Sequence, residues 1–257
     1  MKSVWDGYIS FGMVSIPVKL FSAIEHQALG FRLLHSKCHT PLKYKRWCPK
    51  CKKEVKWEDV VKGIEIGKNK FYILTKEALE ELKPEKTNNI EIVEFVDTQQ
   101  IDHIYYDSHY YVVPREKKER AYFLFKEVLQ LTAKAAIGRF VMKEREHVCA
   151  IESYKKGLLL TTLNYNYEIR DIDKIPELGA MPRLRKEEIL LAKKLISKLY
   201  EEELDMGQFK DSFAEELRRA LRVKEKGELV TVGKRMKKAK KKGRTLIEAL
   251  EASLKKA

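Results

Sequence analysis

The stretch that decides the fold is YISFGMVSIPVKLF, at residues 8–21. It is rich in β-branched and aromatic residues, and Gly12 and Pro17 interrupt it. Such residues favour strands, and glycine allows the chain to turn between them. Residues 4–24 are therefore predicted to be strands, at the start of a chain that is mainly β with helices.

The strand-rich sequence pattern continues to about residue 175. Thr75 is a good N-cap for a short helix, and apolar residues three and four apart predict an amphipathic helix over 117–133. Gly157 allows the turn of a hairpin. The further strands that we expect are 90–96, 105–113, 135–143, 148–153 and 158–165.

Helical periodicity replaces strand patterns after Pro182. We expect helices at 186–204, 209–223 and 246–254. This change predicts three parts: a β-rich core at 1–180, a helical region at 181–232, and a tail with a short terminal helix at 233–257.

Positive charge is concentrated in two short segments. The 257 residues carry a formal net charge of +14, and residues 31–56 and 233–257 each contribute +8. Such clusters on an otherwise balanced chain indicate a polyanion, usually nucleic acid, with a membrane surface as the alternative for the tail. The candidate DNA contacts are Lys43, Lys45, Arg46, Lys50, Lys52, Lys53, Lys234, Arg235, Lys237 and Lys238.

The first basic segment also carries two pairs of metal ligands. His35 and Cys38 are separated by two residues, as are Cys48 and Cys51. Four N and S ligands at this spacing suit a structural, tetrahedral Zn²⁺ in a zinc-ribbon-like loop at 31–56. His39 could replace His35, the thiols could be unliganded, or Cys48 and Cys51 could be a redox pair.

No catalytic motif stands out. The chain has no Walker loop, no Gly-x-Ser-x-Gly and no convincing carboxylate cluster, so we expect a protein that is not an enzyme. No apolar stretch approaches a membrane span, and the first residues lack a signal-peptide core. We therefore expect a cytoplasmic protein, associated with the nucleoid.

As a set, the motifs resemble a known family. Residues 5–23, WDGYISFGMVSIPVKLFSA, closely resemble the opening of prokaryotic Ku, the DNA-end-binding protein of non-homologous end joining. The resemblance covers roughly residues 1–180, and 209–211 and 246–254 resemble the bacterial C-terminal pattern. The further matches are YKR (44–46) with CPKC (48–51), DVVKG (59–63), LKPE (82–85), IDHIY (101–105), YY (110–111), AIGRFV (136–141) and REH (145–147).

This resemblance implies a Ku-core β-barrel with a long bridge, homodimerised into a ring that threads double-stranded DNA ends. It also implies recruitment of an ATP-dependent DNA ligase. Residues 31–56 fall where the bridge should lie, so Lys43, Lys45 and Arg46 would face DNA. Kinship does not guarantee zinc, because many relatives lack some of these cysteines.

Two other classes of function use the same residues. A zinc-ribbon nucleic-acid module that forms no ring would need only the two basic segments, but it leaves the long strand-rich region between them unexplained. A nuclease would need clustered carboxylates to hold metal ions, and the sequence offers no convincing cluster.

Overall fold

The computed structural model describes residues 1–25, 30–84, 87–179, 182–225 and 245–254. The chain divides into two units, one within residues 1–170 and the other comprising mainly residues 171–257. The barrel and its insertion belong to the first unit, and the C-terminal helices belong to the second.

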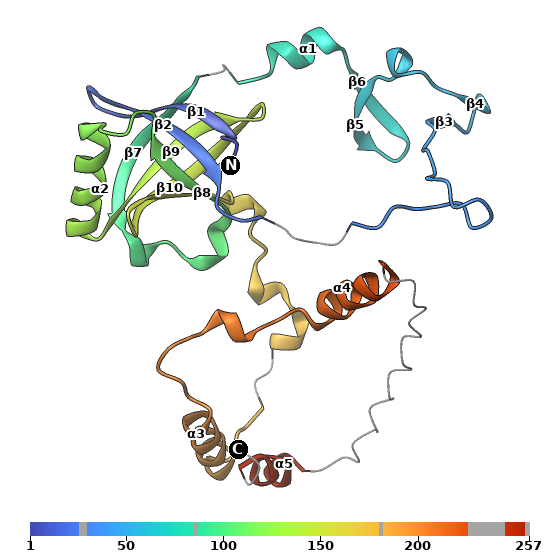
Figure 1. The fold of residues 1–257 in the computed structure, drawn as a ribbon. Coiled ribbons are helices and arrows are strands. Elements are labelled where there is room, and N and C mark those ends of the chain that lie inside the picture. Colours follow the sequence, from blue (N-terminus) through green and yellow to red (C-terminus); the bar gives the residue numbers. More distant parts are fainter. Residues whose placement is uncertain (26–29, 85–86, 180–181, 226–244, 255–257) are drawn as a thin grey trace. The chain divides into compact units, whose positions relative to one another are not determined.

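The first unit contains a closed barrel of seven strands (Figure 1). Around the barrel the order is β1-β2-β8-β11-β10-β9-β7, and the parallel pairing of β1 with β7 closes it. The other neighbouring strands are antiparallel. The strands are β1 (Trp5–Phe11), β2 (Val14–Ser22), β7 (Asn89–Asp97), β8 (Tyr106–Pro114), β9 (Lys134–Met142), β10 (Arg145–Tyr154) and β11 (Gly157–Leu163). The strands predicted from the sequence are confirmed.

The decisive stretch forms the hairpin of β1 and β2. Gly12 turns the chain with a φ of +56°, which glycine adopts at little cost. Ile9 pairs with Ile16 across the hairpin, and both are fully buried. Alternate residues of both strands thus face the barrel interior, as the period of a strand requires.

Helix α2 (Arg120–Thr132) covers one end of the barrel. Its apolar side buries Tyr122, Phe125 and Leu129, spaced three and four residues apart. The Tyr122 hydroxyl donates to the Val112 carbonyl at 2.7 Å and accepts from the Leu158 N–H at 3.0 Å. One buried hydroxyl therefore connects α2 to the backbones of β8 and β11.

Tyr122→Phe should lower the free energy of unfolding by about 1–3 kcal/mol, because two buried backbone groups lose their common partner. Chemical denaturation would measure the loss. Tyr167→Phe is the matched control, since Tyr167 is 80% exposed. A loss for Tyr122→Phe no larger than that of the control would contradict this role of the hydroxyl.

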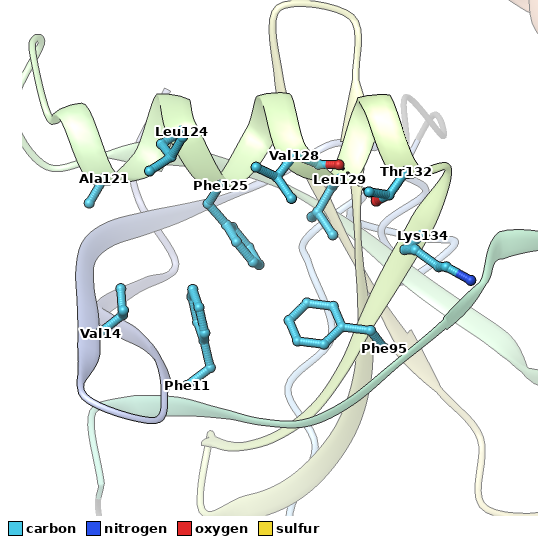
Figure 2. A pocket seen from close by; sticks show the side chains of 10 residues that line it. All are labelled: Phe11, Val14, Phe95, Ala121, Leu124, Phe125, Val128, Leu129, Thr132 and Lys134. Atoms are coloured by element: carbon cyan, nitrogen blue, oxygen red, sulfur yellow. Dashed lines mark hydrogen bonds between the residues drawn. The ribbon is translucent and has the colours of Figure 1, made fainter.

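An apolar groove of about 430 Å³ runs along α2 (Figure 2). Phe11, Phe95 and Phe125 form an aromatic cluster in it, with ring centroids 5.2–6.4 Å apart. Lys134 is the one charged residue among those that line it, and its ammonium group pairs with Asp97. The groove therefore does not suit phosphates. Its lining residues are Phe11, Val14, Phe95, Ala121, Leu124, Phe125, Val128, Leu129, Thr132 and Lys134.

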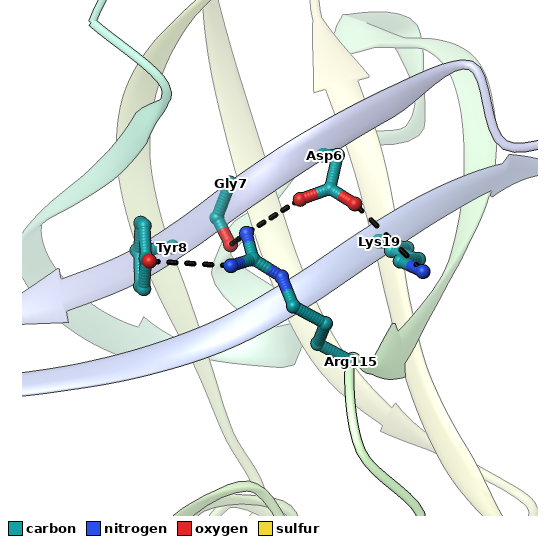
Figure 3. Close-up of polar contacts among 5 residues, drawn as sticks. All are labelled: Asp6, Gly7, Tyr8, Lys19 and Arg115. Carbon is teal, nitrogen blue, oxygen red and sulfur yellow. Dashed lines mark hydrogen bonds and ion pairs between the residues drawn. The ribbon is translucent and has the colours of Figure 1, made fainter.

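A polar cluster ties the end of β8 to the β1–β2 hairpin (Figure 3). The Arg115 guanidinium donates to the Asp6 carboxylate, the Tyr8 hydroxyl and the Gly7 carbonyl. Lys19 lies 3.9 Å from the same carboxylate. The hydrogen bond to Tyr8 and the charge of Asp6 raise the pKa of Arg115, so the guanidinium stays charged.

Residues 23–88 form a long insertion between β2 and β7. Across its described part, no residue is buried. Thr75 caps α1 as predicted, because its hydroxyl accepts from the Ala78 N–H. The hairpin of β5 and β6, however, was not among the elements predicted from the sequence. The elements are β3 (Trp47–Cys48), β4 (Lys53–Glu54), η1 (Trp57–Asp59), β5 (Lys62–Gly67), β6 (Lys70–Leu74) and α1 (Lys76–Glu81).

The second unit contains α3 (Lys186–Lys198), α4 (Ser212–Glu225) and α5 (Leu246–Leu254). The periodicity predicts all three helices, but α3 ends at Lys198 and not at residue 204. Lys198 donates to the Leu254 carbonyl at 2.9 Å and joins α3 to α5. Within the described ranges, no helix has the length and apolar character to cross a membrane. Short 3-10 turns are η2 (Thr98–Gln100), η3 (His103–Tyr105), η4 (Asn166–Glu168), η5 (Ile172–Lys174), η6 (Pro176–Leu178) and η7 (Met206–Gln208).

Candidate nucleic-acid interface

The candidate interface is the basic hairpin, which we define as residues 43–57 of the insertion. It contains strands β3 and β4 (Figure 1). All six basic residues predicted here as DNA contacts are exposed: Lys43, Lys45, Arg46, Lys50, Lys52 and Lys53. The other four, Lys234, Arg235, Lys237 and Lys238, lie outside the described residues.

Backbone pairing holds the basic hairpin together. Trp47 pairs with Glu54 and Cys48 with Lys53. The Val55 N–H donates to the Arg46 carbonyl at 2.8 Å, and the Arg46 Nε donates to the Val55 carbonyl at 3.2 Å. The position of the Arg46 side chain is therefore set by the backbone beside it.

The cations of the basic hairpin differ in their local partners. Lys45 pairs with Glu54 at 2.7 Å, and this hydrogen bond raises the pKa of Lys45 while offsetting its charge. The Arg46 guanidinium lies over the Trp57 ring, 4.6 Å from the centroid. No ion pair among the described residues involves Lys43, Lys50, Lys52 or Lys53. These four charges are available to an anionic ligand.

The two predicted pairs of metal ligands each come together locally. His35 Nδ1 lies 3.0 Å from the Cys38 Sγ, and the Cys51 N–H donates to the Cys48 Sγ at 3.5 Å. In the part of the chain that the structure describes, no three His, Cys, Asp or Glu side chains form a group that could hold a metal. The structure therefore shows two half-sites, and a four-ligand zinc site stays a prediction.

The surroundings of the thiols separate their acidities. Hydrogen bonds from the Thr40 hydroxyl and the His35 ring lower the pKa of Cys38 to about 7. The Cys51 N–H and thiol lower the pKa of Cys48, while Cys48 raises that of Cys51. Burial raises the pKa of Cys149 to about 12, and full burial confirms that it is a core residue.

In chelator-treated protein, a short pulse of iodoacetamide at pH 7.5 should modify Cys38 first. The thiolate is the reactive form, and a pKa near 7 leaves most of Cys38 ionised above that pH and protonated below it. Peptide mapping by mass spectrometry would read each site, with buried Cys149 as the unreactive control. Equal labelling of Cys38 and Cys51 at pH 7.5 would contradict this order.

The hairpin of β5 and β6 is a feature of the insertion that the sequence patterns did not predict. Asn69 turns the chain with a φ of +59°, and the alternation of Ile64 and Ile66 was the available signal. Trp57 was also not singled out as a partner of Arg46. Five large apolar side chains of β5 and β6 are at least 56% exposed: Ile64, Ile66, Phe71, Tyr72 and Ile73.

The structure defines this protein as a closed seven-stranded barrel that carries an exposed basic insertion. The family model described as "Ku70/Ku80 beta-barrel domain" matches residues 10–206. The chain belongs to the Ku family, which confirms the resemblance found in its sequence.

Three relatives are each named as a non-homologous end joining protein Ku. The protein of Archaeoglobus fulgidus is 37% identical, and the match covers 99% of this chain and 98% of the relative. That of Heliobacterium modesticaldum is 36% identical, covering 99% and 91%. That of Bacillus subtilis is 34% identical, covering 77% and 64%. The similarity to the first two therefore extends over nearly the whole chain.

Proposed function

We propose that this protein binds double-strand DNA ends without regard to sequence, as a homodimeric ring, in non-homologous end joining. The observation that carries the proposal is an exposed basic hairpin in an insertion of a Ku-family barrel. The names of its relatives specify the pathway.

The exposed apolar side chains of the insertion support a dimer. An isolated two-stranded hairpin is only marginally stable in water, and the hairpin of β5 and β6 has no buried residue. Ile64 pairs with Tyr72, so these two exposed side chains share one face of the hairpin, and an exposed apolar face often marks an interaction site. A second copy packed against this surface would bury it and complete a ring.

Phosphate contacts explain why binding ignores sequence. The charges of Lys43, Lys50, Lys52 and Lys53 have no ion-pair partner in the described part of the chain, and lysine meets phosphate as a flexible point charge. Phosphate contacts position a protein on DNA but carry no base information. A ring adds topology, because a threaded protein leaves DNA only at an end.

Ligation is assigned to a partner. Joining two ends requires a new phosphodiester bond, and the sequence shows no catalytic motif that could form one. We assign that step to an ATP-dependent DNA ligase that the bound protein recruits, and we place the complex in the cytoplasm on the nucleoid. The terminal segment 246–254 is the candidate contact with the ligase.

A gel-shift comparison of one duplex in three forms tests the ring. Linear DNA with free ends should bind, and longer linear duplexes should load additional copies. The same duplex with blocked ends, or as a relaxed closed circle, should bind little. Equal binding to all three would overturn the ring and leave a zinc-ribbon nucleic-acid module; metal-dependent loss of the DNA would indicate a nuclease.

The salt dependence of binding tests the basic hairpin. Removing one phosphate contact should reduce the magnitude of the slope of log binding constant against log salt concentration by about 0.9. Substituting both Lys50 and Lys53 with Gln should therefore reduce it by nearly twice that amount, measured by fluorescence anisotropy on a short linear duplex. Lys45→Gln should reduce it less, because Glu54 already pairs with that cation.

The control for this series is Lys156→Gln, an exposed lysine in the turn between β10 and β11. It should leave the salt dependence unchanged. An equal reduction for the control and for the hairpin variants would contradict a role of the basic hairpin in binding phosphates.

We further propose a structural Zn²⁺ held by Cys38, Cys48, Cys51 and a histidine. The donor set suits zinc, and residues 31–56 contain no buried side chain that could order them by burial alone. When bound, the ion would cross-link the two half-sites and order the basic hairpin beside them.

Elemental analysis should find one zinc per chain, and Cys48→Ser should remove most of it. Cys149→Ala is the control, because that thiol lies in the barrel core. Comparing His35→Ala with His39→Ala would identify the fourth ligand. Purified protein with less than about a tenth of an equivalent of zinc, even after reconstitution under reducing conditions, would reject the site.

A further inference from the structure

We propose that Trp57, with Arg46 against its ring, forms a binding site for an unpaired DNA base, so that the basic hairpin also holds single-stranded DNA. This function goes beyond capture of duplex ends. Its ligand class is single-stranded DNA of any sequence, such as an overhang at a broken end.

The geometry presents one aromatic face to solvent. Trp57 begins η1 and is 70% exposed. The Arg46 guanidinium lies 4.6 Å from the ring centroid, so it covers one face of the indole. Hydrogen bonding between Arg46 and Val55 fixes the guanidinium in place. The opposite face of the ring is left for a planar ligand.

The chemistry of the pair matches a nucleotide. An aromatic ring stacks on any base because every base has a π face, and cations beside it track the backbone phosphates. Arg46 contributes a planar cation against the ring. Lys43, Lys50, Lys52 and Lys53 add charge within the same hairpin. The site therefore offers both stacking and phosphate binding.

Other aromatic residues of the described chain lack this combination. Tyr8 and Tyr154 also have a cation near their rings, but they are only 40% and 39% exposed. Tyr154 in addition stacks on Tyr111. Trp47 is exposed but has no cation over its ring within the described residues. Trp57 thus combines a widely exposed ring with a cation against it in a basic setting.

Tryptophan fluorescence provides a direct readout. The chain has three tryptophans, and Trp5 is only 9% exposed within the barrel. In a Trp47→Phe background, quenching by a ligand therefore reports mainly on Trp57. The probe is an oligo(dT) of about 12 nucleotides, within the site size of such proteins, and the matched ligand is an abasic oligomer with the same phosphates.

We expect oligo(dT) to quench the fluorescence and to bind at least about 5-fold, and up to about 150-fold, more tightly than the abasic oligomer. Trp57→Ala should weaken oligo(dT) binding, measured by anisotropy, by about 5- to 150-fold, the range that one stacked base contributes. Trp57→Phe should restore most of it. Tyr167→Ala, the matched control at another exposed aromatic residue, should leave binding essentially unchanged.

Equal binding of oligo(dT) and the abasic oligomer would overturn the inference, because phosphates alone would then explain affinity. The inference would also fail if Trp57→Ala dissociated the dimer in sedimentation analysis while oligo(dT) binding persisted. The Trp57 side chain would then contact a second copy of the chain and not a base.

The inference rests on the same basic hairpin as the proposed function. Binding to a blunt linear duplex, which has no unpaired bases, distinguishes a failure of the inference from a failure of the proposed function. The expected pattern is a much larger loss of binding to oligo(dT) than to blunt linear duplex in Trp57→Ala, because paired bases are not free to stack on the ring. If the wild-type protein failed to select free duplex ends but still bound oligo(dT) through Trp57, the proposed ring would fail and this site would stand.

Discussion

Closure of the barrel is the constraint on which the rest of the structure depends. The parallel pairing of β1 with β7 closes it, and the Tyr8 N–H donates to the Asn88 carbonyl at 3.0 Å beside that pairing. The Trp5 indole also donates to the Val141 carbonyl of β9. Because β7 is the strand at which the insertion ends, the contacts that close the barrel also anchor the insertion.

The barrel and the insertion are stabilised by different physics. The barrel buries a continuous apolar core, which supplies the main driving force for folding. The described part of the insertion buries no residue and presents both cations and apolar side chains to solvent. Backbone pairing holds its two hairpins together, and under the proposed function a metal, a second copy or DNA would add the order that burial does not supply. Such coupling would link assembly of the ring to the ligands that it holds.

Much of the fold was predictable because its signals are local. Alternation predicted the barrel strands, the three- and four-residue spacing predicted α2, and Thr75 marked the start of α1. The β5–β6 hairpin was not predicted because its alternation is short and an asparagine, Asn69, takes the turn position that glycine usually marks. In the candidate site, charge predicted which lysines are exposed, but not that Glu54 pairs with Lys45 or that Trp57 contacts Arg46.

By itself, the sequence determined the family, the β-rich core, the concentration of charge and the spacing of the two His and Cys pairs, because composition and short-range spacing encode these properties. Only the tertiary structure decided which strands close the barrel, that Tyr122 bridges β8 and β11, and that Arg46 lies on Trp57. Those contacts join residues far apart or on separate short elements. Strand register and side-chain packing create them, and no local pattern records either.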